Sequence, residues 1–232
     1  MEKQKYTAIV LAAGSGKRMN SKVHKQYLII QDRPVLYYSL KAFEDSAVDE
    51  IVLVVGKGEE KFCRKEIVDK YGISKVKAIV EGGKERYHSV FEGLKQTSDA
   101  DYVLIHDGAR PFVNQDIIRR CMQEVQKYQA CVAGMPVKDT IKIADEEGYA
   151  KQTPDRKNVW MIQTPQTFSY ALIYEAYEEM LKTEDTAITD DAMVLERIKG
   201  KKSKLIEGSY RNIKITTPED LLIANVYLQH PE

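Results

Sequence analysis

Short apolar runs recur along the chain at intervals that leave room for a helix between them. The runs are apolar throughout and rich in β-branched residues, which is typical of strands buried on both faces. They occupy residues Thr7–Ala12, Glu50–Gly56, Val76–Val80 and Tyr102–His106. Strands of this kind, separated by helices, predict an α/β fold with a mainly parallel sheet covered by helices on both faces.

The stretches between these runs are amphipathic with a helical period. They cover residues 35–45, 59–72, 85–96 and 114–128. Pro34 suits a first helical turn, and Gly72 suits the end of a helix. A last helix is predicted to begin at Thr217, because this cap is followed by Pro218 and, three residues on, by Asp220.

The alternation of strands and helices breaks after Met135. Residues 136–160 alternate in polarity, turn at Asp145–Gly148 and return without a helical stretch. This predicts a hairpin insertion of about residues 137–158, called the arm below, that projects from the sheet. A lone two-stranded ribbon is marginally stable, so the arm is expected to pack on its own domain or, as its polar character favours, on a second subunit. The sheet is expected to resume with Val159–Gln163, Leu205–Glu207 and Asn212–Thr216.

Length and composition fit one domain, residues 1–232, that includes the arm. Hydrophobic residues make up 43% of the chain and charged residues 30%, and 35 acidic residues balance 35 basic ones. A chain without net charge has no global field that attracts nucleic acid or an anionic membrane, so neither is expected as a partner. Any anion site must therefore be built locally.

The cysteines and the lengths of the apolar runs indicate the cellular compartment of the protein. Cys63, Cys121 and Cys131 are odd in number and form no CxxC pair, so buried, reduced thiols are the simplest interpretation. The apolar run after Lys3 and Lys5 is short and leads into a basic loop, which favours a first strand over a signal peptide. No run approaches the ~20 residues that span a bilayer. These features predict a cytoplasmic protein.

The segment LAAGSGKRM, residues 11–19, follows the first predicted strand. It is not a P-loop, because Leu11 and Arg18 stand where that motif needs Gly and Ser or Thr. It is not a dinucleotide fingerprint either, because Met19 stands where the third glycine would be. What remains is a glycine loop at the carboxyl end of a strand, where open α/β sheets bind ligands.

This opening loop is a candidate phosphate site. Gly14 and Gly16 would let backbone N–H groups approach an anion closely. Lys17, Arg18 and, a short distance further on, Lys25 add positive charge. The alternative is a tight turn whose cations are merely solvated.

Charged residues also stand at two later strands. The run ending at Ile105 delivers His106 and Asp107 to a strand end. Asp107 suits Mg²⁺, which takes one or two protein carboxylates and fills its other positions with phosphate oxygens and water. The alternative is that Asp107 caps the next turn or pairs with Arg110, and His106 is expected to be a packed strand residue. Lys214 lies in a predicted strand and either reaches a phosphate or, as is usual for lysine, points to solvent.

Seven segments occur in one order from end to end of the chain. They read AAGSGKRM…KQYL, GGKERYHSV, HDGARPF, PVKDTIK, TPQTF, TDDAMVLE and GSYRNIKITTPEDL. In this set the chain resembles the 2-C-methyl-D-erythritol 4-phosphate cytidylyltransferases of the non-mevalonate isoprenoid route, from Thr7 to about Leu228. The opening loop alone is shared with many sugar-phosphate nucleotidylyltransferases, whereas the full set is specific.

The resemblance implies a homodimer with a Rossmann-like sheet, in which the arm reaches into the neighbouring subunit. It implies a reaction that joins CTP and methylerythritol phosphate, with Mg²⁺, and releases pyrophosphate. The two reactants repel one another, and a phosphate oxygen is already a nucleophile. Catalysis is therefore expected to consist of positioning and charge neutralisation, without a Ser/His/Asp or Cys/His arrangement.

The resemblance also implies roles for residues of the matching motifs. Arg18, Lys25 and Lys214 would be catalytic, and Asp107 would hold Mg²⁺. The nucleotide would be bound by Ala12, Ala13, Gly14, Ser15, Gly16, Gly83, Arg86 and Ser89. The sugar phosphate would be bound by Asp107, Arg110, Thr140, Arg156, Thr164 and Lys214, with Gln166 shaping its pocket and with Thr140 and Arg156 supplied by the partner's arm.

Two positions depart from the family's usual residues, and one acidic pair has a structural explanation. His24 stands where the family usually has proline, which would loosen the opening loop. Lys84 stands where an aspartate is frequent, which affects base selectivity only if its side chain takes part. Asp190 and Asp191 are expected to belong to a helix N-terminus capped by Thr189 rather than to a metal site.

Two other functions remain as alternatives. A ribitol-5-phosphate cytidylyltransferase would run the same reaction on a longer polyol, and HDGARPF and GSYRNIKITTPEDL do not separate it, whereas TDDAMVLE and PVKDTIK favour methylerythritol. A non-catalytic nucleotide-binding regulator of the same fold is disfavoured, because it would not need Arg18, Lys25, Asp107 and Lys214 together.

Overall fold

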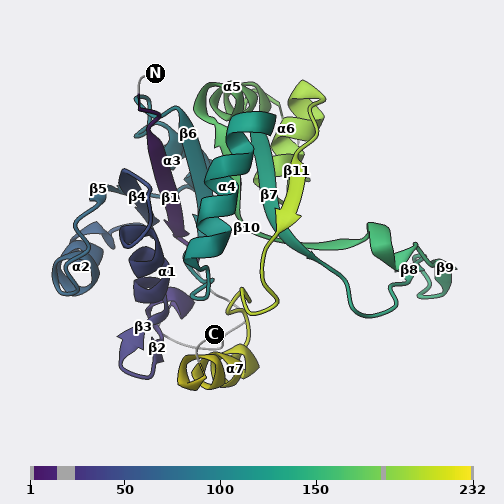
Figure 1. The fold of residues 1–232 in the computed structure, drawn as a ribbon, viewed down its shortest axis with the longest axis horizontal. Helices are drawn as coiled ribbons and strands as arrows, with labels where there is room; N and C mark the ends of the chain where they lie inside the picture. Colours follow the sequence, from purple (N-terminus) through teal and green to yellow (C-terminus); the bar gives the residue numbers. More distant parts are fainter. Residues whose placement is uncertain (1–2, 15–23, 184–186, 231–232) are drawn as a thin grey trace.

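The computed structural model describes residues 3–14, 24–183 and 187–230. Within these ranges, helices cover both faces of a seven-stranded sheet, and a small hairpin projects to one side (Figure 1). The strand order is β11-β7-β10-β6-β1-β4-β5. The strands are β1 (Tyr6–Ala12), β4 (Glu50–Val55), β5 (Val76–Glu81), β6 (Tyr102–Asp107), β7 (Ala130–Pro136), β10 (Trp160–Ser169) and β11 (Lys204–Glu207).

Most neighbouring strands in this sheet are parallel. β1 pairs in parallel with β4 and β6, β4 with β5, and β7 with β11. Among the described strands of this sheet, only β10 runs antiparallel to its neighbours, β6 and β7. The predicted α/β class with a Rossmann-like, mainly parallel sheet is confirmed. β7 was not among the predicted strands, and β10 continues well beyond Gln163, where the prediction ended it.

Side chains alternate between two apolar clusters, one on each face of the sheet. On β1, Ala8 and Val10 belong to one cluster and Ile9 to the other, because successive side chains of a strand point to opposite faces. One cluster includes side chains of α1 (Val35–Glu44), α2 (Glu60–Cys63) and α4 (Gln115–Tyr128). The other includes side chains of α3 (Arg86–Leu94), α5 (Tyr170–Met180) and α6 (Asp191–Lys199).

The helix predicted over 59–72 is interrupted. It begins as the short α2 and continues as a π-helix, η3 (Arg64–Asp69), before Gly72 ends it with a φ of 63°. The last helix, α7 (Pro218–Gln229), starts as predicted, because Thr217 and Asp220 form a reciprocal capping box. α5 was not predicted. Short elements complete the chain: η2 (Lys25–Tyr27), β2 (Ile29–Ile30), β3 (Arg33–Pro34), β8 (Ile143–Ala144), β9 (Ala150–Gln152) and η4 (Arg156–Asn158).

The prediction of a strand over Asn212–Thr216 is wrong. These residues form a loop whose backbone bonds to other turns, such as Ile215 N to Ala109 O at 2.8 Å. The alternating Ile213 and Ile215 pack in a small third cluster with Ala224 of α7. A period of two therefore arose here from packing beneath a helix and not from a ladder of strands.

The arm is the predicted hairpin. β8 and β9 pair antiparallel, and the turn between them uses Gly148 at a φ of 90°, a value that favours glycine. Asp145 Oδ1 accepts hydrogen bonds from the backbone N–H groups of Glu147 and Tyr149. Figure 1 shows the hairpin projecting from the end of the sheet formed by β7 and β10.

Among the described residues, no helix combines the length and the apolar character needed to cross a bilayer.

Candidate active site

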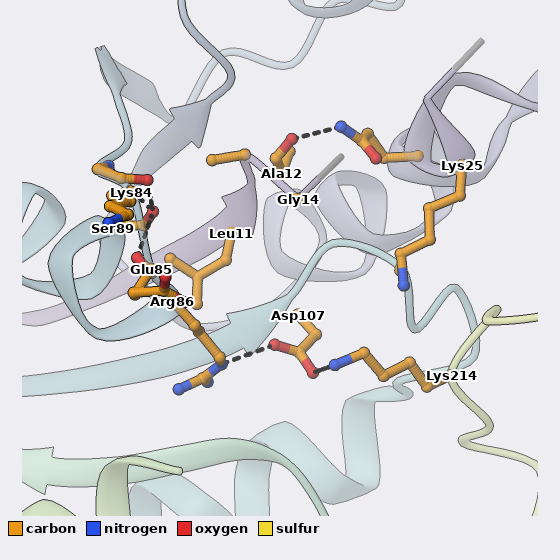
Figure 2. A pocket seen from close by; sticks show the side chains of 14 residues that line it. Leu11, Ala12, Gly14, Lys25, Lys84, Glu85, Arg86, Ser89, Asp107 and Lys214 are labelled. Carbon is orange, nitrogen blue, oxygen red and sulfur yellow. Dashed lines mark hydrogen bonds and ion pairs between the residues drawn. The ribbon is translucent and has the colours of Figure 1, made fainter. Parts of the chain in front are cut away.

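The carboxyl ends of β1 and β6 border a pocket of about 360 Å³ (Figure 2). Parallel strands end at one edge of a sheet, so the loops that follow them converge there. The pocket is lined by Leu11, Ala12, Ala13, Gly14, Lys25, Gln26, Gly83, Lys84, Glu85, Arg86, Ser89, Asp107, Ala109 and Lys214. Segments far apart in the sequence thus meet around one cavity.

Most of the residues proposed from the sequence lie at this pocket. Arg110 and Thr164 do not line it but contact Asp107 from behind. Thr140 and Arg156 lie on the arm and are not among the lining residues. Ser15, Gly16 and Arg18 fall outside the described residues. Those that line the pocket are Ala12, Ala13, Gly14, Lys25, Gly83, Arg86, Ser89, Asp107 and Lys214.

Asp107 forms the floor of the pocket with three cations around it. Its Oδ2 lies 2.7 Å from Lys214 Nζ and 3.8 Å from Arg110 Nε, and its Oδ1 lies 3.3 Å from Arg86 Nε. Burial by itself would raise the pKa of Asp107, but the charges of Arg86, Lys214 and Arg110 outweigh burial and hold the pKa well below its usual range. The carboxylate is therefore ionised, and the floor carries more positive than negative charge.

Lys214 reaches this floor from a loop. Its ammonium pairs with Asp107, so the alternative of a lysine that simply points to solvent does not hold. The next residue, Ile215, accepts a hydrogen bond from Lys25 Nζ through its carbonyl at 3.0 Å. The segments carrying Lys25 and Lys214 are thus joined directly, although they lie at opposite ends of the sequence.

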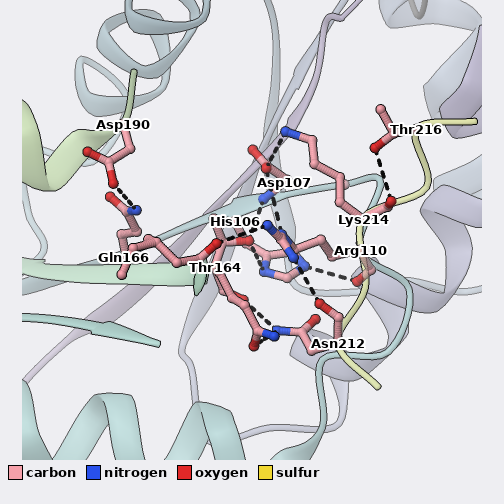
Figure 3. A network of polar contacts seen from close by, with 12 residues as sticks. His106, Asp107, Arg110, Thr164, Gln166, Asp190, Asn212, Lys214 and Thr216 are labelled. Carbon is pink, nitrogen blue, oxygen red and sulfur yellow. Dashed lines mark hydrogen bonds and ion pairs between the residues drawn. The ribbon is translucent and has the colours of Figure 1, made fainter. Parts of the chain in front are cut away.

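A polar network lies behind Asp107 (Figure 3). The N–H of Asp107 donates to Thr164 Oγ1 at 3.1 Å, Thr164 Oγ1 lies 3.0 Å from His106 Nδ1, and His106 Nε2 lies 3.2 Å from the carbonyl of Arg110. A carbonyl only accepts, so Nε2 carries the proton and Nδ1 accepts from the Thr164 hydroxyl. Burial lowers the pKa of His106 from 6.5 to about 4. His106 is thus a neutral, packed strand residue, as expected.

Asn212 was not proposed from the sequence, yet it connects several residues that were. Its carbonyl accepts from Arg110 Nη1 at 2.8 Å, and its Nδ2 donates to the carbonyl of Thr164 at 2.9 Å. The side chain is fully buried. Asn212 therefore joins the segments of Arg110 and Thr164 and holds the start of the loop that carries Lys214.

The opposite wall of the pocket is built by the turn before α3. Ser89 Oγ accepts from Gly83 N at 3.1 Å. A Cβ atom at Gly82 would lie 2.5 Å from the Cβ of Ala13, and one at Gly83 would lie 2.3 Å from the Cβ of His88. At Gly82, only glycine lets the turn approach the end of β1 this closely, and at Gly83 only glycine leaves room for His88.

The segment around Lys25 is fixed by two side chains. Gln26, another residue that was missed, is buried and donates to the carbonyl of Ala12 at 2.5 Å. His24 Nδ1 lies 2.8 Å from Glu59 Oε1. Glu59 Oε2 accepts from Tyr27 Oη at 2.7 Å. The residue that departs from the family's proline therefore lies in contact with Glu59.

The paired acids at the start of α6 have two different structural roles. Asp190, and not Thr189 as predicted, caps the helix by accepting from Met193 N at 2.9 Å. Asp191 is fully buried and forms a bidentate ion pair with Arg86 at 2.7 and 2.8 Å. The sequence signal for a helix N-terminus was correct, but it did not reveal the link to Arg86.

The chain matches known proteins over nearly its whole length. A family model described as 2-C-methyl-D-erythritol 4-phosphate cytidylyltransferase matches residues 6–230. Relatives of that name from Lachnospira eligens and Lachnoclostridium phytofermentans are 54% and 50% identical, over 96% and 97% of this chain and 99% and 97% of their own.

Solved structures agree with this match. A 4-diphosphocytidyl-2C-methyl-D-erythritol synthase from Anaerococcus prevotii has a TM-score of 0.86 and 38% identity, over 98% of this chain and 97% of its own. A 2-C-methyl-D-erythritol 4-phosphate cytidylyltransferase from Thermus thermophilus has a TM-score of 0.77 and 30% identity, over 95% and 98%. The predicted resemblance is confirmed, and the chain belongs to the 2-C-methyl-D-erythritol 4-phosphate cytidylyltransferase family.

Proposed function

We propose that this pocket joins CTP to 2-C-methyl-D-erythritol 4-phosphate, giving 4-diphosphocytidyl-2-C-methyl-D-erythritol and pyrophosphate in isoprenoid biosynthesis by the non-mevalonate pathway. The observation that carries the proposal is the convergence of Lys25, Asp107 and Lys214 on one cavity whose other wall is the Gly83–Ser89 turn (Figure 2). Membership of the family supplies the identity of the two substrates. The same membership does not favour the ribitol phosphate alternative.

The reaction requires two anions to meet. CTP carries about −4 and the sugar phosphate close to −2 near neutral pH, so their approach is opposed by repulsion. A phosphate oxygen of the sugar phosphate bonds to the α-phosphorus of CTP, and the bond from that phosphorus to the bridging β-phosphate oxygen breaks. Pyrophosphate leaves with the electron pair. No proton is removed from the nucleophile, so the protein's task is to position the reactants and offset their charge.

The cations of the pocket take the central roles in this scheme. Lys25, together with Arg18, stabilises the charge on the pentacoordinate phosphorus. Lys214 contacts the α-phosphate and the incoming phosphate, and for this it exchanges its partner Asp107 for phosphate oxygens. Gly14, with Ser15 and Gly16, offers backbone N–H groups to the triphosphate.

The cytosine base is assigned to the wall formed by the turn before α3. Cytosine presents an amino donor beside acceptors, so backbone carbonyls and N–H groups with one hydroxyl can distinguish it from uracil. Gly83 and Ser89 offer these groups at the pocket, and Ala12 and Ala13 lie beside them. Because the contact at Gly83 uses backbone atoms, Lys84 is compatible with selection of CTP.

Asp107 fits one ligand position of a divalent ion that arrives with the nucleotide. Its carboxylate is ionised at the edge of the pocket, and Mg²⁺ accepts a single protein carboxylate when phosphates supply its other ligands. Among the described residues, no group of three or more His, Cys, Asp or Glu side chains could hold a metal, so the protein would supply few ligands. When bound, Mg²⁺ would offset charge on the phosphates.

The sugar phosphate is assigned to residues of two subunits. Arg110 and Thr164 lie beside Asp107, whereas Thr140 and Arg156 are exposed on the arm and would reach the partner's pocket. Tyr149 on the arm is 70% exposed, and Met161 at its root is 45% exposed, which a second copy would cover. We therefore include a homodimer in the proposal. A cytoplasmic location is supported by three buried cysteines without disulfides.

Pyrophosphate release is the direct test. Each of the four nucleoside triphosphates is supplied with methylerythritol phosphate and Mg²⁺, and the expected result is release with CTP far above the other three. Ribitol 5-phosphate is then compared as the acceptor, and faster release with it would replace the proposed substrate. CTP binding without turnover of either acceptor would point to a regulator.

A further inference from the structure

Asp191, the first residue of α6, is a fully buried carboxylate whose two oxygens both have charged partners. Its Oδ1 and Oδ2 lie 2.7 and 2.8 Å from Nη1 and Nη2 of Arg86, and Tyr177 Oη donates to Oδ1 at 2.5 Å. Burial and the adjacent charge of Asp191 raise the pKa of Tyr177 well above its usual value, so this phenol stays a donor. Burying a carboxylate is costly unless it is paired in this way.

The anchor for Arg86 is fixed by two further elements. Gln166 of β10 accepts from the backbone N–H groups of Asp191 and Ala192 at 3.0 and 2.9 Å through its Oε1. Its Nε2 donates to Asp190 Oδ2 at 2.9 Å (Figure 3). The carboxylate is therefore held between β10, α5 and α6, which are parts of the packed core and not loops.

Arg86 connects this anchor to the pocket. Its two terminal nitrogens are used by Asp191, and its Nε lies 3.3 Å from Asp107 Oδ1 (Figure 2). Burial would lower the pKa of Arg86, but Asp191 and Asp107 outweigh burial and hold it well above its usual value. The cluster thus contains three cations, Arg86, Arg110 and Lys214, against two carboxylates, which leaves one positive charge in excess.

We infer that Asp191 is a positioning residue for the nucleotide side of the pocket, a role that rests on the proposed function. It does not line the pocket. By holding both terminal nitrogens of Arg86, it fixes the guanidinium plane and directs the Nε edge toward Asp107. Without this carboxylate, Arg86 would turn toward the next available anion, Asp107 or a phosphate, and the Gly83–Ser89 wall that includes Arg86 would lose its fixed position beside the nucleotide.

Asp191→Asn tests this inference, because it keeps the shape of the side chain and removes its charge. We expect the KM for CTP to rise ~10-fold and kcat/KM for CTP to fall ~100-fold, since misplacement of a binding group by about 1 Å costs this much. The KM for methylerythritol phosphate is expected to change less than ~3-fold. A purely structural role would lower the amount of active enzyme and leave both KM values unchanged.

Thr97→Val is the matched control. Thr97 follows α3, the helix of Arg86, and its fully buried hydroxyl donates to the carbonyl of Leu94 at 2.9 Å. The substitution removes a buried polar contact next to the same helix but touches no member of the cluster. Both KM values should stay at wild-type levels, and a rise in the KM for CTP in this control equal to that in Asp191→Asn would overturn the inference.

Tyr177→Phe tests the same role of Asp191 if Asp191→Asn does not fold. It removes one hydrogen bond from the carboxylate and leaves the ion pair, so we expect the KM for CTP to rise ~3-fold. An unchanged KM for CTP in whichever variants fold would overturn the inference. If the wild type releases no pyrophosphate, the proposed function is wrong, and the role of Asp191 is then tested by calorimetric measurement of CTP binding. Equal affinity for CTP in the wild type and in Asp191→Asn would reject that role.

Discussion

The floor of the pocket and the arm are built in opposite ways. At the floor, Asp107 is held by Lys214, Arg86 and Arg110, which come from three different segments, and its side chain is only 11% exposed. On the arm, Arg156 is exposed and its guanidinium donates to the carbonyl of Lys138 within the arm itself. Ion pairs with partly buried side chains fix the charges of the floor, whereas the arm presents polar groups to its exterior.

This difference separates two kinds of contribution to one reaction. Charged groups that are already oriented contribute most to stabilising a transition state, because no reorganisation is needed during the reaction. Groups on an exposed arm can contribute to binding once a second surface orients them. Changes at the floor should therefore reduce the chemical step, and changes on the arm should reduce use of the acceptor.

The largest effect is expected from Lys25→Ala. Removing a cation from the charge-stabilising set should lower kcat ~10²–10³-fold, while the fold stays intact because Lys25 lies at the surface of the pocket. Steady-state pyrophosphate release gives kcat, and circular dichroism reports on the fold. Lys41→Ala, which alters an exposed pair with Asp45 on α1, is the control and should retain wild-type kcat. A kcat for Lys25→Ala close to that of the control would contradict this assignment.

The second effect concerns stability and belongs to the floor alone, since the arm contains no histidine. Burial lowers the pKa of His106 from 6.5 to about 4, so between these values the unfolded chain binds the extra proton. The contribution of His106 is complete above pH 6.5 and is lost as the pH falls toward 4, at a cost of ~3 kcal/mol. The pKa of Asp107 lies lower still, so its own contribution is lost only at more acidic pH.

Urea unfolding at pH 8, 6 and 5 measures this loss. His106→Gln should unfold more easily at pH 8 but with a smaller decrease between pH 8 and pH 5 than the wild type. If the free energy of unfolding falls equally with pH in the two proteins, the neutral histidine behind Asp107 is not the group that titrates.

A smaller effect is expected from Arg156→Ala on the arm. Loss of one charge-assisted contact should lower kcat/KM for methylerythritol phosphate ~10–30-fold and leave the KM for CTP nearly unchanged. Mixed dimers of Lys25→Ala and Arg156→Ala subunits sharpen the comparison. If each arm serves the other subunit, one site of such a dimer keeps both residues, and activity is partly regained. Absence of any rescue would instead favour an arm that serves its own pocket.

The smallest effect is expected from His24→Pro. The φ of His24 is −61°, which proline adopts without strain, and the partly exposed contact with Glu59 is worth little. We expect kcat to change less than ~3-fold and Tm to move by a few degrees at most. A drop in kcat approaching that of Lys25→Ala would show that His24 holds Lys25 in place by more than its contact with Glu59.

Local patterns predicted most strands of the sheet and a few residues of the pocket, such as Gly14, Lys25 and Asp107, for a physical reason. Other pocket residues, such as Gly83 and Ser89, were proposed from the family resemblance. Strands buried on both faces are visible as apolar runs, and parallel strands deliver their last residues, such as Asp107, to one edge. Loops were harder. Ile213 and Ile215 alternate as they would in a strand, but packing beneath α7 is the cause. A period of two cannot separate these cases.

Long-range pairing was the main thing the sequence did not reveal. The acids at the start of α6 were recognised as belonging to a helix N-terminus, and that part was correct. The partner of Asp191 is Arg86, more than a hundred positions earlier, and no local spacing encodes such a contact. Asn212 was missed for the same reason, because its role depends on Arg110 and Thr164 meeting it in space.

Two contacts in the empty pocket affect how the enzyme binds its nucleotide. Lys25 donates to the carbonyl of Ile215, and Lys214 pairs with Asp107. An empty pocket of bare ammonium groups would repel itself and attract any passing anion. Here each group already has a substitute partner, so loading a nucleotide is an exchange of partners and not a simple addition. The enzyme thus gives up some affinity for its substrates, and in return the cations of the empty pocket stay paired and in place between turnovers.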